Sequence, residues 1–342
     1  MTSSAQNDVI HSRSDAAMNS DQGDWAVLAR GLVRRFGKTP AVDGLDLAVS
    51  RGQIYGIVGP DGAGKTTTMR MLCGALVPDA GDAHVAGHDV VREPERVKER
   101  IGYLSQQFAM YGHLTVWENI RFTADLFDVP EGEWQENGER LLQASRMTPF
   151  KDRLASNLSG GMKQKLALTC ALVHTPEVIF LDEPTTGVDP ISRRDFWHIL
   201  YDLPRRGVTV IVSTPCMDEA ERCQRLTFML AGKAIAEGTP EAIKAGIGLQ
   251  VIEVQARPLD AVRRLIAGMP GVMEVAVFGT SLHILVHEAD VSCDEVRAFL
   301  QGPGIEIRTC RPVPMGLEDA FLALSRQTRP EPVAADEPAQ HA

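Results

Sequence analysis

Residues 53–67 read QIYGIVGPDGAGKTT: a short apolar run, a glycine-rich turn and the beginning of a helical pattern. The turn, from residue 59 to residue 67, matches the spacing G-x-x-x-x-G-K-[ST]. Its place between a strand and a helix is the context that this pattern requires. The glycines allow backbone N–H groups to wrap a phosphate chain, and the helix N-terminus adds partial positive charge. The stretch therefore predicts a phosphate-binding loop in an α/β fold.

Two side chains of this turn carry the expected chemistry. Lys65 would reach the β- and γ-phosphates of a bound nucleotide, and the Thr66 hydroxyl would ligate Mg²⁺. The other members shape the turn so that backbone N–H groups face the phosphates. The residues expected to bind nucleotide here are Gly59, Pro60, Asp61, Gly62, Ala63, Gly64, Lys65, Thr66 and Thr67.

A second motif, VIFLDEP at residues 178–184, supplies two acidic side chains. Its four apolar residues indicate a buried strand, and Asp182 follows at the carboxyl end, where ligands of open α/β sheets bind. We expect Asp182 to hold Mg²⁺ through water and Glu183 to polarise the attacking water in phosphoryl transfer. An acidic pair after an apolar strand is a weak signal alone. With the phosphate-binding turn upstream it becomes a strong one.

The pattern around both motifs indicates an α/β core. Short β-branched runs alternate with helical patterns from residue 27 to about residue 236, and residues 53–58, 178–181 and 208–212 predict buried strands. This alternation predicts a largely parallel sheet that is covered by helices on both faces. Between about 115 and 158 helical patterns replace the strand patterns, which indicates a helical insertion.

The C-terminal part predicts a second, smaller domain. Strand and helix patterns follow the order β-α-β-β-α-β over about residues 249–312, which is typical of a ferredoxin-like unit, and one more helical pattern follows. The sequence therefore divides into a domain at 25–246 and a domain at 247–326. Residues 1–24 and 327–342 are rich in polar, acidic or proline residues, and we expect a disordered leader and a disordered tail.

The composition excludes several classes of protein. The 342 residues predict about two domains, and the fractions of apolar (44%) and charged (23%) residues are close to the soluble average. The net charge of −10 argues against a protein that coats nucleic acid, and no apolar run approaches the ~18 residues of a membrane span. The six cysteines include no CxxC pair, and Cys73 and Cys170 fall in helical apolar patterns, as buried hydrophobes do.

A third motif, LSGGMKQK at residues 158–165, connects these patterns to a family. Ser159 is a good helix N-cap, and Gly160 and Gly161 would expose backbone N–H groups to an anion. LSGG-x-x-Q resembles the signature of ABC transporter ATP-binding cassettes. Together with the phosphate-binding turn upstream and VIFLDEP downstream, it extends the resemblance to this family over about residues 25–240. The resemblance implies that Ser159 and Gly161 touch the γ-phosphate bound by a second cassette, so that dimerisation completes each ATP site.

The same resemblance implies a fold, cofactors and partners. The fold would be an ABC-type P-loop ATPase core of class α/β with an antiparallel β subdomain and a helical insertion, beside the ferredoxin-like C-terminal domain. ATP and Mg²⁺ would be the cofactors. The partners would be a second cassette, in a homo- or heterodimer, and an integral membrane permease, with no nucleic acid. The chain would lie at the cytoplasmic face of the inner or cell membrane as a peripheral protein.

Three further residues match positions of the family pattern. Phe36, in RRFGKTPAVDGLDL, would stack on adenine, and a core phenylalanine is the alternative. Gln106, in IGYLSQQ, would join the Mg²⁺ shell, assist catalysis and link to the helical insertion, although the neighbouring Gln107 could take this position. Asp189, in TTGVDP, matches the loop that crosses the dimer interface in this family.

One position departs from the family pattern. After the strand VTVIVST the family usually has a histidine that contacts the γ-phosphate and orients the water, whereas this chain has Pro215 in STPCMDEAE. Proline cannot donate a hydrogen bond from its backbone or its ring. His174 and His198 fall in other elements, where we expect solvated surface histidines. The sequence therefore predicts ATP binding, but slow hydrolysis.

Three further stretches indicate a subgroup of this family: YGHLTVWENIRFTADLF, MDEAERC and GLEDAFLAL. They resemble the ATPase subunits of drug- and lipid-exporting ABC systems, the daunorubicin-resistance-like group. This resemblance implies an ATP-hydrolysing subunit that powers a separate permease for drugs, lipids or similar amphiphiles. One alternative is a hydrolysis-impaired regulatory or asymmetric partner of an active cassette, which Pro215 favours and Glu183 opposes. Another is a soluble ABC protein of translation or DNA repair, although such proteins usually have two cassettes, or zinc or coiled-coil insertions.

Overall fold

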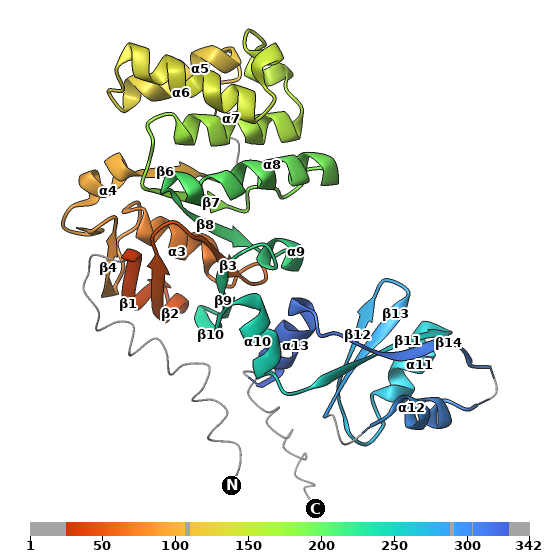
Figure 1. The fold of residues 1–342 in the computed structure, drawn as a ribbon. Coiled ribbons are helices and arrows are strands. Elements are labelled where there is room, and N and C mark those ends of the chain that lie inside the picture. The colour runs from red at the N-terminus through yellow and green to blue at the C-terminus, as the bar shows by residue number, and fades with distance from the viewer. Residues whose placement is uncertain (1–24, 107–109, 288–290, 303, 328–342) are drawn as a thin grey trace, which may run out of the picture. The chain divides into compact units, whose positions relative to one another are not determined.

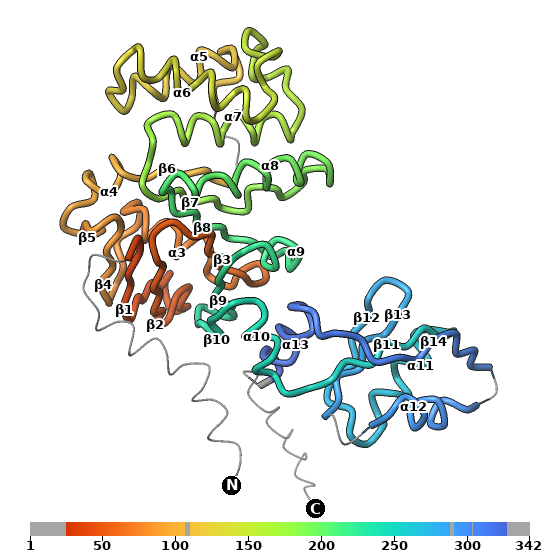
Figure 2. The backbone as a smooth tube through the Cα atoms, in the orientation of Figure 1, coloured from red at the N-terminus to blue at the C-terminus, as the bar shows by residue number. Residues whose placement is uncertain are grey.

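The computed structural model describes residues 25–106, 110–287, 291–302 and 304–327 (Figures 1 and 2). The chain divides into two compact units, one up to residue 242 and one from residue 243. The division falls inside α10 (Pro240–Gly246), whereas the sequence predicts the boundary after residue 246. The predicted leader at 1–24 and the tail from 328 lie outside the described residues.

A six-stranded sheet forms the centre of the first unit, with the strand order β10-β9-β3-β8-β7-β6. Every residue of β3 (Ile54–Val58), β7 (Val178–Asp182) and β8 (Thr209–Thr214) is buried, as continuous apolar runs in a parallel sheet should be. These three strands coincide with the three predicted ones. Neighbours from β9 (Arg225–Leu230) to β6 (Ile101–Leu104) pair in parallel, and β10 (Lys233–Gly238) is antiparallel.

A second sheet of this unit is antiparallel, with the order β2-β1-β4-β5. Its strands are β1 (Trp25–Phe36), β2 (Thr39–Ser50), β4 (Ala80–Val85) and β5 (His88–Asp89). The helix α3 (Lys65–Leu72) lies between the two sheets, because it packs on β7 and β8 on one side and on β2 and β4 on the other (Figure 2). One apolar core therefore joins both sheets, and it includes Tyr55, Phe180 and Met69.

The opposite face of the six-stranded sheet is covered by α7 (Gly160–Leu172) and α8 (Pro190–Asp202). The strand-free stretch expected at 115–158 contains α5 (Val116–Leu126), α6 (Glu131–Ala144) and the 3₁₀ turns η2 (Thr148–Phe150) and η3 (Ala155–Asn157). Thr115 and Glu118 cap α5 reciprocally. Residues of α5, α6 and α7 share a core of their own, and these helices lie together at the top of Figure 1. The other elements of this unit are α4 (Pro94–Arg100), η4 (Pro204–Arg206) and α9 (Met217–Ala220).

The second unit has the element order β-α-β-β-α-β followed by a helix. Its four-stranded antiparallel sheet has the order β12-β13-β11-β14. The elements are β11 (Gln250–Arg257), α11 (Leu259–Ile266), β12 (Val272–Phe278), β13 (Ser281–Val286), α12 (Cys293–Phe299), β14 (Glu306–Val313) and α13 (Leu317–Gln327). Buried residues of α11, α12 and the sheet form its core. On α13, Asp319 accepts a hydrogen bond from Nδ1 of His283 on β13 over 2.9 Å.

Candidate active site

The glycine-rich turn lies against backbone oxygens that leave no room for side chains at two of its positions. A Cβ on Gly59 would lie 2.2 Å from the Met229 carbonyl oxygen, and one on Gly64 would lie 2.3 Å from the Ala41 carbonyl oxygen. Gly64 also has a φ of +103°, a conformation that costs other residues energy. The backbone N–H of Gly59 donates to Thr214 on β8 over 3.2 Å, which fixes the turn at the carboxyl ends of the parallel strands.

Lys65 begins α3 directly after this turn and is almost fully buried, with 3% of its surface exposed. Its Nζ donates to the carbonyl oxygens of Gly59 (2.8 Å) and Pro60 (3.0 Å) and lies 3.3 Å from Oε1 of Glu183. A buried ammonium requires such partners. The arrangement places a positive charge inside the turn, where phosphate oxygens could take over these contacts.

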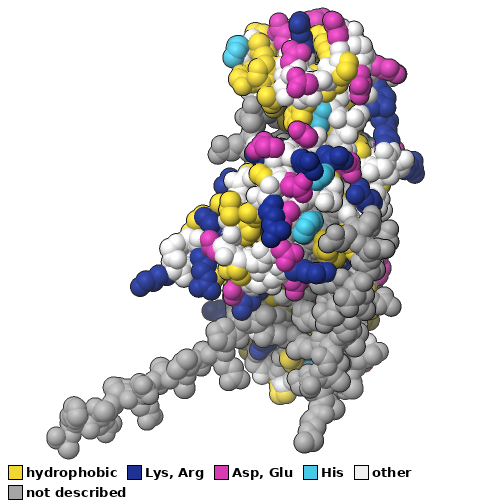
Figure 3. All heavy atoms as spheres, turned by 90° about the vertical axis from the view of Figure 1, so that its left-hand side faces the viewer, with side chains coloured by type: hydrophobic (Ala, Val, Ile, Leu, Met, Phe, Trp, Pro, Cys, Tyr) yellow, Lys and Arg dark blue, Asp and Glu magenta, His cyan; other side chains and the backbone are white. Residues whose placement is uncertain are grey.

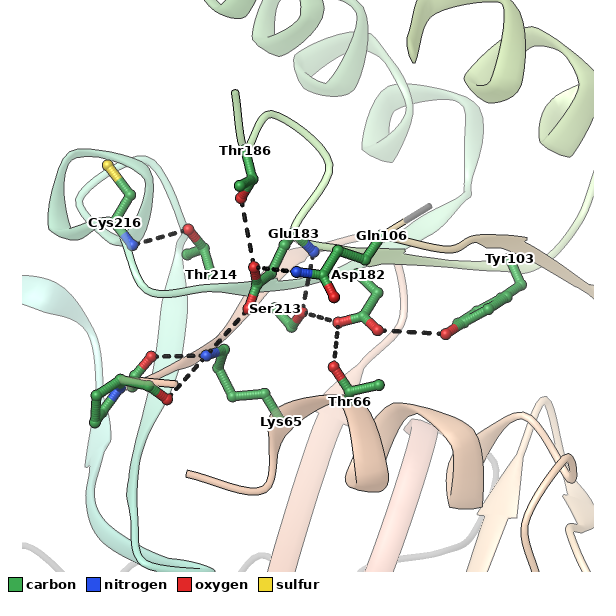
Figure 4. A network of polar contacts seen from close by, with 12 residues as sticks. Lys65, Thr66, Tyr103, Gln106, Asp182, Glu183, Thr186, Ser213, Thr214 and Cys216 are labelled. Atoms are coloured by element: carbon green, nitrogen blue, oxygen red, sulfur yellow. Dashed lines mark hydrogen bonds and ion pairs between the residues drawn. The ribbon is translucent and has the colours of Figure 1, made fainter. Parts of the chain in front are cut away.

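Asp182 is held by three side chains at the carboxyl end of β7 (Figure 4). Its Oδ1 accepts hydrogen bonds from Thr66 Oγ1 (3.1 Å) and Ser213 Oγ (2.5 Å), and its Oδ2 lies 3.4 Å from Tyr103 Oη. Burial, with the Asp182 charge as a second cause, raises the pKa of Tyr103 well above its usual value, so this hydroxyl stays protonated. The sequence predicted Asp182 and Thr66 each as a Mg²⁺ ligand. It gave no signal for Ser213 and Tyr103.

Glu183 has a left-handed backbone conformation with a φ of +49°. Its N–H donates to both the carbonyl oxygen (3.0 Å) and the hydroxyl (3.1 Å) of Ser213. Gln106 donates from Nε2 to Glu183 Oε2 over 3.0 Å, and Thr186 Oγ1 lies 3.4 Å from the same oxygen (Figure 4). Non-glycine residues in this conformation cluster at functional sites, where the surrounding structure maintains them. The contacts with Gln106, Thr186 and Lys65 hold the carboxylate in place.

The fold thus brings Lys65, Thr66, Gln106, Asp182 and Glu183 together from positions up to 118 residues apart. Gln107, the alternative to Gln106, lies outside the described residues. The Thr66 hydroxyl, the Asp182 carboxylate and the Gln106 amide offer oxygen ligands beside the turn, and Mg²⁺ prefers oxygen ligands. These residues therefore fit a Mg²⁺ ion bound together with a nucleotide.

The signature motif lies at the N-terminus of α7. Ser159 is the N-cap, and its hydroxyl accepts a hydrogen bond from the Met162 N–H over 3.4 Å. Ser159 and Gly160 are exposed, and nothing lies within 4 Å of a Cβ placed on Gly160. Gly161 is buried, since a Cβ there would lie 2.5 Å from the Ser192 side chain on α8. The N-terminus of α7 is therefore open to solvent at Ser159 and Gly160.

Two predicted nucleotide contacts lie away from this network. Phe36 ends β1 with 54% of its surface exposed, and the Arg34 guanidinium lies 5.3 Å from its ring centre. Its exposure argues against the alternative of a core phenylalanine. Asp189 is the N-cap of α8, and its Oδ1 accepts from the N–H groups of Ile191 (3.1 Å) and Ser192 (2.9 Å). These hydrogen bonds, chiefly that from Ser192, hold the pKa of Asp189 below its usual value.

Pro215 follows β8 and is exposed. On one side of it the Thr214 carbonyl oxygen accepts from Gly59, and on the other side the Cys216 N–H donates to Thr214 Oγ1 over 3.0 Å. Pro215 therefore stands next to the phosphate-binding turn, but it offers no N–H there.

The two histidines considered as substitutes differ in their surroundings. His198 is exposed, as expected. The expectation of a solvated surface residue is wrong for His174, because its ring stacks on Phe127 with centroids 3.8 Å apart and its Nε2 bonds to the Ile101 carbonyl oxygen over 2.9 Å. Burial lowers the pKa of His174. This histidine therefore helps to join α5, α7 and β6 rather than the site.

The chain is similar to known proteins over most of its length. It is 42% identical over 223 residues to a probable multidrug ABC transporter ATP-binding protein of Escherichia coli (strain K12), covering 65% of this chain but only 39% of that relative. It is 36% identical over 312 residues to the daunorubicin/doxorubicin resistance ATP-binding protein of Streptomyces peucetius, covering 88% of this chain and 92% of that protein. The chain belongs to the ABC transporter family of ATP-binding proteins. Residues 42–186 also match the family profile described as ABC transporter.

The structure agrees with this assignment to the ABC transporter family. A solved structure described as the ATP binding subunit of an ABC transporter superposes with a TM-score of 0.61 at 25% identity, covering 65% of this chain and 93% of that one. The predicted family and the cassette fold are thus confirmed. ABC transporter ATP-binding proteins bind and hydrolyse ATP, which is the chemistry that the buried Lys65, Asp182 and Glu183 suit.

Proposed function

We propose that this chain is an ATP-binding and ATP-hydrolysing subunit that dimerises and powers a separate membrane permease at the cytoplasmic face of the cell membrane. The observation that carries the proposal is the convergence of Lys65, Thr66, Gln106, Asp182 and Glu183 on the glycine-rich turn. The relatives named for multidrug transport and daunorubicin/doxorubicin resistance favour the export of drugs, lipids or similar amphiphiles.

Each side chain of the site has a distinct part in this proposal. The turn at residues 59–67 binds the phosphate chain through its backbone N–H groups, and Lys65 exchanges its carbonyl contacts for β- and γ-phosphate oxygens. Thr66, Asp182 and Gln106 would hold Mg²⁺, which neutralises charge on the phosphates. Glu183 takes a proton from the attacking water, since Gln106 and Lys65 hold its carboxylate at the turn. The exposed ring of Phe36 stacks on the adenine.

The exposure of the signature motif supports the proposed dimerisation. Ser159 and Gly160 face solvent at the N-terminus of α7, where backbone N–H groups attract an anion. The Ser159 hydroxyl bonds within its own helix, and Gly161 packs against Ser192 on α8. We therefore assign Ser159, Gly160 and Gly161 to the γ-phosphate that a second cassette holds, with Asp189 in the loop between the two cassettes.

A permease would dock on the helical part of the first unit. Tyr111, Phe122 and Leu126 expose 45%, 43% and 69% of their surfaces, and Figure 3 shows hydrophobic side chains gathered over this helical part at the top. Beside them a cavity of about 370 Å³ opens between α3, β6, α5 and α7, and Met110 and Phe127 are among its lining residues. Among the described residues no helix has the length and apolarity of a membrane span.

Pro215 favours a second candidate function, a hydrolysis-impaired partner of an active cassette. The position next to the phosphate-binding turn has no hydrogen-bond donor for the γ-phosphate, and a positioned donor of this kind contributes roughly 10²–10³-fold to a rate. The intact contacts of Glu183 with Lys65 and Gln106 oppose this alternative. We therefore propose slow hydrolysis in a homodimer rather than none.

A combined binding and sedimentation experiment tests the proposal. Full-length protein and its Glu183→Gln variant are incubated with Mg²⁺ and ATP, and their molecular mass is measured by analytical ultracentrifugation. We expect the variant to form a stable ATP-dependent dimer and Ser159→Arg to abolish it, with nucleotide binding retained in both. A Glu183→Gln variant that binds ATP but stays monomeric at all concentrations would reject the homodimer, and absence of ATP binding would reject the proposed function.

A further inference from the structure

Two cysteines meet in the second unit, 17 positions apart in the sequence. Cys293 is the first residue of α12, Cys310 lies on β14, and the helix packs against this strand. The Cys310 thiol donates to the Cys293 carbonyl oxygen over 3.6 Å, and the Cys293 side chain is among the neighbours that raise the pKa of this thiol. The fold therefore places the Cys310 sulfur beside the first residue of α12, although the sequence has no CxxC motif.

The two thiols differ in their access to solvent. Cys310 is 7% exposed and belongs to the core of the unit with Val296 and Leu300, whereas Cys293 is half-buried at the edge of this core. Burial is the main cause that raises the pKa of Cys310 to about 12, and the contact with Cys293 acts in the same direction. A small oxidant would therefore react with Cys293 first, because Cys310 is buried beneath the surface.

A cation stands beside the pair. Arg297, one turn along α12 from Cys293, donates from Nη2 to the Cys310 carbonyl oxygen over 3.2 Å, and its charge lowers the pKa of the Cys310 thiol against the effect of burial. Burial outweighs the guanidinium, so the pKa of Cys310 stays raised and Cys310 remains a protonated thiol. The site thus contains a half-exposed thiol, a second thiol within contact and a positive charge.

We propose that Cys293 and Cys310 form a reversible dithiol–disulfide pair, oxidised by hydrogen peroxide, that joins α12 to β14. The Cys293 sulfur attacks one peroxide oxygen, the O–O bond breaks, and a sulfenic acid and one water form. The Cys310 sulfur then attacks the Cys293 sulfur, the S–O bond breaks, and the leaving hydroxide takes the Cys310 proton as a second water. Two thiols lose two hydrogen atoms, one peroxide becomes two waters, and a thiol reductant reverses the change.

The disulfide would restrain the segment from α12 to β14. It closes the loop from residue 293 to residue 310 and ties the first residue of α12 to β14, so the N-terminus of the helix can no longer separate from this strand. We expect amide hydrogen exchange in residues 293–299 to slow at least several-fold on oxidation. The first unit has no part in the reaction, so the outcome does not depend on the proposed ATPase function.

The test is peroxide treatment of the full-length chain, followed by alkylation of the remaining thiols in denaturant and peptide mass spectrometry. We expect a peptide pair joined between Cys293 and Cys310, lighter by two hydrogen masses than the two reduced peptides and separated again by dithiothreitol. Cys216 is the matched control, because it is also half-buried and its sulfur lies 3.9 Å from the Arg193 guanidinium. Cys216→Ser should leave the cross-link unchanged.

Single variants test the order of the two steps. With Cys310→Ser, peroxide should leave a sulfenic acid on Cys293 that dimedone traps, whereas Cys293→Ser should give little trapping at Cys310. Far-UV circular dichroism and hydrogen exchange of the reduced variants serve as the control that both fold. The proposal is overturned if wild-type Cys293 goes on to the sulfinic acid while Cys310 stays a free thiol, or if Cys216 is oxidised and the pair is not.

Discussion

Ser213→Ala should destabilise the first unit more than the loss of an ordinary buried hydroxyl does. The Ser213 hydroxyl donates to the Asp182 carboxylate and accepts from the Glu183 N–H. In Ser213→Ala the Glu183 N–H still donates to the carbonyl oxygen of residue 213. The group that loses a hydrogen bond without replacement is therefore the Asp182 carboxylate. Asp182 is 1% exposed, and its other partners are Thr66 at 3.1 Å and Tyr103 at a long 3.4 Å.

The magnitude follows from the charge of the acceptor. A hydrogen bond to a charged group contributes about 1.5–3 kcal/mol to stability, whereas a neutral one contributes about 0.5–1.5 kcal/mol. We therefore expect Ser213→Ala to lower the free energy of unfolding by about 2 kcal/mol. Ser145→Ala is the matched control, because the Ser145 hydroxyl is also buried but donates only to the carbonyl oxygens of Leu141 (2.8 Å) and Leu142 (3.2 Å).

Urea unfolding followed by tryptophan fluorescence measures both losses. All four tryptophans, at positions 25, 117, 134 and 197, lie in the first unit, so the signal reports on that unit. We expect unchanged m-values and a lower midpoint for Ser213→Ala than for Ser145→Ala. Equal losses in the two variants would show that Ser213 does not stabilise a buried charge, and would refute this account of how Asp182 is held.

Four other outcomes are expected. Lys65→Ala should weaken binding of a fluorescent ATP analogue by roughly ten- to a hundredfold, as loss of a charge-assisted contact of about 1.5–3 kcal/mol requires, and unchanged affinity would remove Lys65 from the site. Pro215→His should raise steady-state ATPase activity above wild type, with Glu183→Gln as the inactive control; no rise, together with a wild type far above that control, would show that the histidine is not needed. A chain truncated after Gly246 should still bind ATP, and a folded truncation that does not would contradict the independence of the first unit. Burial raises the pKa of Cys170 to about 12, above that of a thiol in the unfolded chain, so the stability that the buried neutral thiol contributes is complete below about pH 8 and is lost as the pH rises towards 12. Between pH 8 and 10 the urea midpoint should therefore fall less in Cys170→Ala than in the wild type. Parallel curves of midpoint against pH for the two proteins would contradict this.

Contiguous patterns predicted most of the cassette. The phosphate-binding turn, the strand that ends at Asp182 and the N-cap at Ser159 are each defined by neighbours within about ten residues, and strands of a parallel sheet are apolar along their whole length. For the same reason the strand and helix order of the C-terminal unit is visible in the sequence. The predicted domain boundary, after residue 246, lies at the end of α10, and the two compact units divide inside this helix.

The sequence by itself determined the family, the turn that receives phosphate and the acidic residues beside it, since these depend on spacing along the chain. Only the tertiary structure decided which side chains support them. Ser213 reaches Asp182 from 31 residues away because β7 and β8 pair in register, and Cys310 reaches Cys293 because α12 folds back on β14. Burial likewise made His174 a packed ring rather than a solvated one. Such contacts join residues that are far apart in sequence. They arise from packing between elements, and this packing leaves no local periodic pattern in the sequence.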